Sequence, residues 1–270
     1  MIEWRHWHNE PYLIGGLVLL GWLWAILAGP LRERLAPGEP FPRKHARRFY
    51  AALVVFYLAV GSPLDQIGER FLFSAHMLQH QILTYLVPIL FLSGVPSWMI
   101  DRVLGKPDLR RVLRVLLHPI ICVLTYALVI SVWHMPTLYE WALQNKIVHV
   151  IEHVMFFGVA LLFWWPMLSP SRVLPPISHG SQMLYFFLSV ITMTPLFAYI
   201  AFSHDILYPT YEFAPRVVAD FSAKDDQLLA GVSMQLMSVA VAIAAFGVAF
   251  FRWSRTDQLA AAKTRSQAAR

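Results

Sequence analysis

The sequence predicts an all-α polytopic membrane helical bundle of about seven transmembrane helices, with the N-terminus outside and the C-terminus cytoplasmic. Hydrophobic residues make up 57% of the chain and charged residues only 14%, whereas soluble domains carry about a quarter charged residues. Seven mostly apolar stretches approach the roughly 20 residues that a helix needs to cross the hydrocarbon of a bilayer. Basic residues also gather in alternate loops. These three observations predict a protein embedded in the lipid bilayer.

The expected spans follow one another with short loops, and the second is the shortest. They cover residues 12–28, 48–62, 71–92, 116–133, 148–168, 183–202 and 228–251. The first residues lack the basic segment of a cleaved signal peptide, so the first span is expected to be permanent. Pro119 after His118 is expected at the start of the fourth helix. Without an internal repeat or a long linker, residues 1–252 are expected to form one domain, and residues 253–270 a polar cytoplasmic tail that frays.

The orientation follows from the basic residues, because short cytoplasmic loops retain Lys and Arg. Of the 22 basic residues, 17 lie in the loops after spans one, three and five or follow span seven. This asymmetry places the N-terminus outside and the C-terminus inside. The net charge of +6 is thereby a signal of membrane topology, and it requires no nucleic acid as a partner.

Histidines are distributed in the opposite way. Most of the eleven map to the outer side. They are His6, His8, His76, His80, His134, His149, His153 and His204. Because ionisable side chains in membrane helices usually face the bundle interior or a water-filled cavity, this grouping predicts a functional site at the outer side.

Two short motifs place histidines four residues apart where an apolar segment begins. His76 and His80 open the third span, and His149 and His153 open the fifth. The spacing of four puts both imidazoles of a pair on one helix face. His134 closes the fourth span, so adjacent antiparallel helices could bring all five rings to one depth.

The residue types in these motifs predict a metal site. Imidazole suits zinc and copper, and the thioether of Met77 favours Cu(I). The single cysteine, Cys122, permits no intramolecular disulfide and argues against a thiolate site. Glu152 and Asp226 are expected to support the site, since a carboxylate beside a metal-bound histidine can fix its tautomer. The expected ligands are His76, Met77, His80, His134, His149 and His153.

Three other interpretations stay open. Residues 149–153 match the HxxEH signature of zinc proteases, which need a third protein ligand. Glu212 and Asp220 are candidates for this ligand only because they are expected on the same side of the membrane. Histidines on facing helices could hold haem in a haem or quinone membrane electron carrier. In a metal-free scaffold, the histidines would be hydrogen-bonded anchors and Met77 would fill space in the core.

An ordered series of motifs covers about residues 71–250. It comprises HMLQH at 76–80, GVP at 94–96, HP at 118–119, WHMPTLY at 133–139, HVIEH at 149–153, FWWP at 163–166, LYP at 207–209 and DDQLLAG at 225–231. In these motifs the chain resembles the CtaG-like family of bacterial cytochrome c oxidase assembly factors, seven-span membrane proteins implicated in copper delivery. The first 70 residues fit only as two further spans.

The resemblance implies a multi-pass protein of the bacterial inner membrane that is not an enzyme. It also implies a haem-copper cytochrome c oxidase as client, with the copper-containing catalytic subunit as the partner. Together with the histidine motifs, it predicts a factor that binds Cu(I) at the periplasmic side and assists its insertion into the oxidase.

Overall fold

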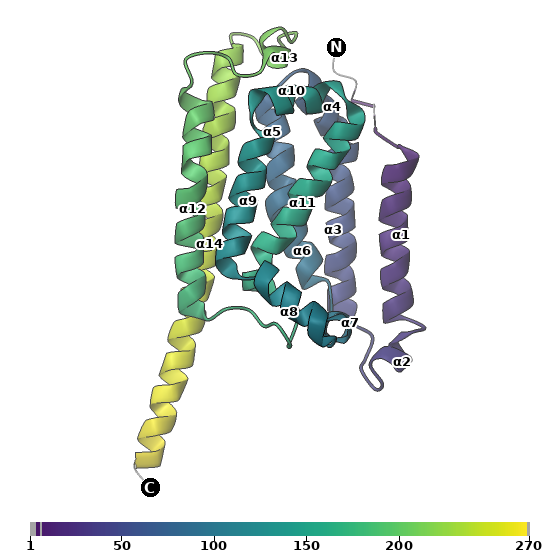
Figure 1. Cartoon of the computed structure of the whole chain (residues 1–270), viewed down its shortest axis with the longest axis vertical. Coiled ribbons are helices and arrows are strands. Elements are labelled where there is room, and N and C mark those ends of the chain that lie inside the picture. Colours follow the sequence, from purple (N-terminus) through teal and green to yellow (C-terminus); the bar gives the residue numbers. More distant parts are fainter. Residues whose placement is uncertain (1–3, 6, 269–270) are drawn as a thin grey trace.

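A computed structural model describes residues 4–5 and 7–268 (Figure 1). Every regular element among these residues is helical, which confirms the predicted all-α class; His6 lies outside them. The elements are α1 (Pro11–Ala28), α2 (Arg32–Leu35), α3 (Arg43–Gly61), α4 (Pro63–Arg70), α5 (Phe73–Gln81), the π-helix η1 (Ile82–Leu86), α6 (Val87–Ser93), α7 (Ser97–Leu104), α8 (Pro107–Leu116), α9 (Pro119–Trp133), α10 (Pro136–Gln144), α11 (Lys146–Leu168), α12 (His179–Phe202), α13 (Pro209–Glu212) and α14 (Ala223–Ala268).

Five helical segments of the described chain are long and apolar enough to cross a membrane, and there are up to seven if each of two bent helix pairs counts as one span. The five are α1, the continuous segment from α5 through η1 to α6, α11, α12 and α14. The bent pairs are α3 with α4, at 41°, and α8 with α9, at 61°. The expected second and fourth spans fall in these two pairs.

Both bends occur where a proline opens the next helix. Pro63 begins α4 and Pro119 begins α9, with His118 at the N-cap. Proline lacks the backbone N–H that would continue the preceding helix, but it fits the first turn of a new one. The helix of the second span also begins earlier than predicted, at Arg43 rather than at residue 48. Lys and Arg are good helix formers, and their long stems can lie along apolar surface.

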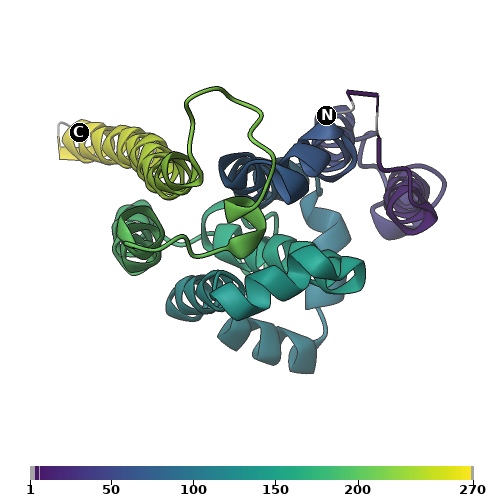
Figure 2. The same cartoon turned by 90° about the horizontal axis from the view of Figure 1, so that it is seen from above.

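The helices form a central group with a pair on one flank and a single helix on the other (Figures 1 and 2). The segment from α5 to α6, with α3, α9 and α11, makes up the centre. α12 and α14 run side by side, and α1 stands on the opposite flank. The N-terminus lies at the end of the bundle where α5 and α11 begin, whereas α7 and α8 lie at the other end.

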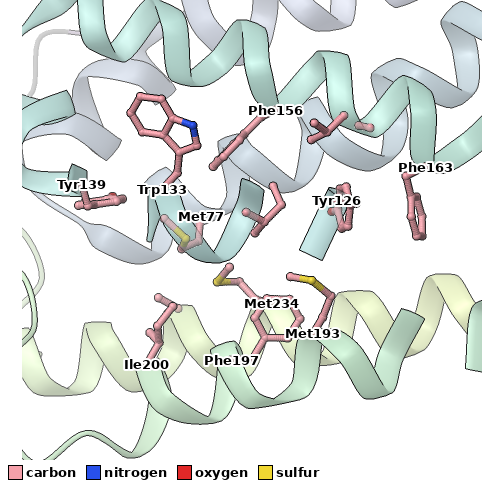
Figure 3. Packing of buried hydrophobic residues seen from close by; sticks show 14 of the residues in the cluster. Met77, Tyr126, Trp133, Tyr139, Phe156, Phe163, Met193, Phe197, Ile200 and Met234 are labelled. Carbon is pink, nitrogen blue, oxygen red and sulfur yellow. The ribbon is translucent and has the colours of Figure 1, made fainter. Parts of the chain in front are cut away.

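Aromatic and sulfur-containing side chains fill the space between the central helices and the α12–α14 pair (Figure 3). Phe156 and Phe163 of α11 belong to the same buried cluster as Met193 of α12. α12 and α14 pack closely at a glycine: a Cβ on Gly231 would lie 2.7 Å from the backbone N of Ala201. Small residues at such contacts allow the close packing that holds helices together in lipid.

The structure differs from the expectation that the C-terminal tail frays. α14 continues without a break to Ala268 and extends beyond the rest of the bundle (Figure 1). The segment from residue 255 onward is rich in Ala and also contains Arg, Gln and Lys, all of which have high helix propensity. The polar composition that predicted fraying is therefore also compatible with a helix outside the membrane.

Candidate metal centre

Four buried side chains from two helices converge towards the end of the bundle that carries the N-terminus. His76 of α5 and His149, Glu152 and His153 of α11 each offer a ligand atom, and these atoms lie within 4.8 Å of one another. We call them the histidine–glutamate cluster. Ligands on opposite sides of one ion, with bonds of about 2.1 Å, stand about 4.2 Å apart. Small side-chain rotations could therefore close the cluster around one ion.

Three members of the cluster share one face of α11. Residues three and four positions apart are neighbours on a helix surface, which brings Glu152 and His153 beside His149. The start of α11 is fixed by Asn145, whose side-chain oxygen accepts hydrogen bonds from the backbone N–H groups of Ile147 and Val148 at 3.0 and 3.3 Å. This N-cap sets the helix register only four residues before His149.

α5 is held in place from two sides. Asp226 of α14 accepts hydrogen bonds from the backbone N–H groups of Phe73 and Ser74, at 2.6 and 3.0 Å. Gly68 of α4 permits a close approach, because a Cβ there would lie 2.9 Å from the Cα of His76. Asp226, which was expected to support the site, thus caps the helix that carries His76, and its charge suits the helix N-terminus.

Glu69 orients one of the imidazoles. Its Oε1 lies 2.8 Å from Nδ1 of His149. An ionised carboxylate only accepts, so Nδ1 carries the hydrogen and Nε2 of a neutral ring bears a lone pair. That Nε2 is buried and has no hydrogen-bond partner among the described residues. Carboxylates fix the tautomer of metal-binding histidines in this way.

Other ligand atoms of the cluster are also unpartnered. Both carboxylate oxygens of Glu152 and Nε2 of His153 are buried without a hydrogen-bond partner in the part of the chain that the structure describes. Buried polar atoms are nearly always hydrogen-bonded, and a buried carboxylate without a partner is costly. A bound cation would satisfy these atoms, so the residues fit a metal ion.

His80 extends the cluster along α5, since its Nε2 lies 2.9 Å from Nε2 of His76. The π-helix η1 begins two residues later, and Trp164 of α11 donates a hydrogen bond to the backbone oxygen of Thr84 at 2.9 Å. Pro88 lacks the N–H that would bond to this oxygen in an α-helix, which leaves it free for the indole. π-helical turns occur frequently at functional sites, and this one ties α5 to α11.

Met77 and His134, the other two expected ligands, lie apart from the histidine–glutamate cluster and face each other. Met77 Sδ is 3.3 Å from His134 Nε2, and both side chains are buried. Consecutive residues of a helix point about 100° apart, so Met77 cannot share the face of His76. The ring of His80 neighbours both groups, with its centroid 4.3 Å from that of His76 and 5.8 Å from that of His134.

A cavity of about 290 Å³ adjoins the cluster between α1, α3 and α11. Most of its lining is apolar, but His149, His153 and Glu69 also line it, together with the pair formed by His8 and Asp65. His8 Nδ1 lies 2.6 Å from Asp65 Oδ2. This hydrogen bond raises the pKa of His8, although burial opposes the shift. The cavity thus connects two cluster histidines with the polar residues at this end of the bundle.

The sequence analysis missed two carboxylates that organise this region. Asp65 contacts His8 and also accepts a hydrogen bond from Gln79, at 2.5 Å, while Glu69 contacts His149. The available signal was their position between the second and third expected spans, on the side where the histidines gather. Glu212 and Asp220 were the candidates for a third zinc ligand. Glu212 is the last residue of α13, and neither residue belongs to the histidine–glutamate cluster.

The chain was compared with known protein families, curated proteins and solved structures. Residues 22–256 match the family described as cytochrome c oxidase caa3 assembly factor (Caa3_CtaG). No curated protein and no solved structure matches the chain. The matched range includes the whole histidine–glutamate cluster together with Met77, His80 and His134.

Proposed function

The chain belongs to the cytochrome c oxidase caa3 assembly factor family, and from this premise we propose that it holds a copper ion at the histidine–glutamate cluster and assists its insertion into the oxidase. It is a multi-pass membrane protein. Membership of the family implies a non-catalytic role and an interaction with cytochrome c oxidase. The proposed client is the copper-containing catalytic subunit.

The observation that carries the proposal is the convergence of unpartnered ligand atoms in a buried place. His76, His149, Glu152 and His153 bring their ligand atoms within 4.8 Å of one another. Glu69 contacts Nδ1 of His149, and the buried Nε2 of this ring has no hydrogen-bond partner among the described residues. Ionisable residues within membrane helices are costly and mark functional sites by default. A cation offsets that cost, because it pairs with Glu152 and accepts the imidazole lone pairs.

Copper is the ion that the donor set and the client favour together. Three imidazoles and a carboxylate would also suit Zn(II), since softness and geometry rather than raw affinity decide which metal binds. His80 adds a fourth imidazole at 2.9 Å from His76, and Met77 brings a thioether into the neighbourhood. We therefore propose His76, His80, His149 and His153 as copper ligands, with Glu152 neutralising the charge of the ion.

The proposed side of the membrane is the outer one. The cluster residues lie near the starts of α5 and α11, and Figure 1 shows that both helices begin at the end of the bundle that carries the N-terminus. The distribution of Lys and Arg predicts that this end is outside. The cavity beside His149 and His153 supports release to a client, because a delivery site needs a path along which the ion can leave.

The first test is metal content. The protein is purified in detergent, loaded with Cu(I) without oxygen, and compared with the double variant His149→Ala/His153→Ala. We expect the wild type to retain copper in stoichiometric amount and the double variant to lose the copper of the cluster. His118→Ala is the matched control, because His118 occupies the N-cap position of α9, where its side chain makes no capping hydrogen bond. In cells, the double variant should also lower the copper content and activity of the oxidase.

Other results would contradict the proposal and point to the alternatives. A Soret band in the purified protein would indicate a haem carrier. Bound zinc together with a peptidase activity that Glu152→Gln abolishes would indicate a zinc protease, for which His76 could supply the third ligand. Equal and negligible copper in wild type and double variant, with normal oxidase copper in both strains, would indicate a metal-free scaffold.

A further inference from the structure

Met77 and His134 make a contact that the histidine–glutamate cluster does not use. His134 Nδ1 lies 2.7 Å from the backbone oxygen of Ile130, and on the other side of the ring Nε2 lies 3.3 Å from Met77 Sδ. A carbonyl oxygen can only accept, so Nδ1 carries the hydrogen. In a neutral imidazole, Nε2 then bears a lone pair.

This leaves two electron-pair donors facing each other. A thioether sulfur is also only an acceptor, so no hydrogen lies between Met77 Sδ and the Nε2 of a neutral His134. A protonated His134 ring would place a hydrogen between these two atoms, but the ring would then be a buried cation. Its described neighbours are Met77, the Ile130 carbonyl and the rings of His80, Tyr139 and Phe156, none of which is negative. An unpaired buried charge of this kind is costly.

A soft cation resolves this conflict. Imidazole and thioether together suit Cu(I) and do not suit hard divalent ions. The pair is shielded from water, since Met77 is 0% and His134 1% exposed, and Figure 3 shows Met77 among Trp133, Tyr139 and Phe156. Such an enclosure would also limit the access of water to the ion.

We propose that Met77 and His134 form a second site for Cu(I), distinct from the histidine–glutamate cluster and adjacent to it. His80 joins the two sites: its Nε2 lies 2.9 Å from His76, its ring neighbours that of His134, and its Nδ1 has no hydrogen-bond partner among the described residues. An ion that passes between the sites has this imidazole beside it. The inference rests on the proposed copper role and adds a second, softer site to it.

The two sites can be distinguished by comparing the binding of Cu(I) with the binding of Zn(II). The cluster contains a carboxylate and accepts Zn(II) as well as copper, whereas the Met77–His134 site is expected to take Cu(I) alone. We therefore expect the purified full-length wild type to bind two Cu(I) ions per chain but one Zn(II). X-ray absorption at the copper edge should show sulfur as a neighbour of part of the copper.

Substitutions then show which of the two sites holds each bound ion. Met77→Leu keeps the volume of the side chain and should lose one Cu(I) and the sulfur signal, with the single Zn(II) unchanged. His149→Ala/His153→Ala should lose the Zn(II) and one Cu(I) but keep the sulfur-bound Cu(I). Met193→Leu is the control, because Met193 of α12 is a buried methionine of the same apolar cluster. It should retain both Cu(I) ions.

The outcomes distinguish this inference from the proposed function. One Cu(I) per wild-type chain without sulfur would overturn the second site and leave the cluster as the copper site. Loss of all copper in both Met77→Leu and the double histidine variant would also overturn it, in favour of one shared site. Sulfur-bound Cu(I) that remains while the cluster binds no copper would support the second site and contradict the proposed function. Should Met77→Leu not fold, the wild-type stoichiometry and sulfur signal still decide.

Discussion

The interface between α5 and α11 and the interface between α12 and α14 are both buried, but their chemistry is opposite. α12 and α14 meet through small and apolar residues, with Gly231 against Ala201. Buried polar side chains there mostly have partners: Ser189 donates to the Phe186 oxygen, and Gln227 accepts from the Leu207 backbone N–H, although Gln235 Oε1 has no partner among the described residues. The α5–α11 interface instead gathers unpartnered imidazoles and a carboxylate.

The comparison distinguishes the contacts that stabilise the bundle from the side chains that serve its function. Helices in lipid associate through close packing of small and apolar surfaces, so the α12–α14 interface needs no ionisable group. Buried ionisable groups oppose insertion and folding. The polar residues of the α5–α11 interface therefore lower the stability of the metal-free protein. Changes at one interface should alter stability, and changes at the other should alter metal binding.

The largest stability effect is expected at the α12–α14 contact. In Gly231→Ala, the new Cβ would lie 2.7 Å from Ala201 N, so the two helices must move apart. Overpacking of this kind costs about 1–3 kcal/mol. The unfolding free energy, measured by titration with a denaturing detergent, should fall by that amount, while the number of bound metal ions should not change.

A second glycine of the same helix supplies the control. A Cβ on Gly247 would meet nothing within 4 Å, and alanine has the higher helix propensity. Gly247→Ala should therefore leave the unfolding free energy unchanged or raise it slightly. Equal destabilisation by both substitutions would show that the close approach at Gly231 does not matter, and loss of metal in Gly231→Ala would show that the two interfaces are coupled.

The next effect is expected in metal affinity rather than stability. Glu69→Gln removes the negative acceptor that orients His149, and loss of such a partner typically weakens metal binding by about 10–100-fold. Competition with a chelator of known copper affinity measures the change. Glu140→Gln is the control, since Glu140 accepts hydrogen bonds from Thr210 at 3.0 and 2.7 Å and does not belong to the cluster. A similar loss in both variants would refute the specific role of Glu69.

The sequence predicted the helical class because runs of apolar residues are long enough to read without three-dimensional information. It did not predict the early start of α3 at Arg43 or the helical tail, since hydropathy separates lipid from water and not helix from coil. The bends before Pro63 and Pro119 depend on where a helix restarts. Proline marks such points, but it does not give the angle between the helices.

The candidate site was predictable only where it depends on local sequence spacing. The pairs His76 with His80 and His149 with His153 follow from helix periodicity alone. Periodicity also places Met77 about 100° around the helix from His76, so one ligand set shared by both residues stays a prediction. The Glu69–His149 contact and the cap of α5 by Asp226 join residues far apart in the chain. Such contacts depend on tertiary packing, which local spacing does not determine.

The smallest effect is expected from the pair of His8 and Asp65, which ties the N-terminal segment to α4. The hydrogen bond to Asp65 raises the pKa of His8 above its usual value near 6.5, although burial opposes the shift. Because the folded pKa is the higher one, the contribution of the pair is fully present below about pH 6.5. It is lost as the pH rises through the folded pKa.

His8→Gln should therefore lower the unfolding free energy of the metal-free protein at about pH 6 and change it little at about pH 9. The loss should not exceed about 1 kcal/mol, the upper range for ion pairs near a surface. The measured quantity is the difference between wild type and variant at each pH, in which the titrations of other groups largely cancel. A difference that grows with pH would have the wrong sign for this pair. Since the Gly231 contact contains no titratable group, the effect of Gly231→Ala should not vary with pH in this range, so the pH dependence itself separates the polar region from the apolar interface.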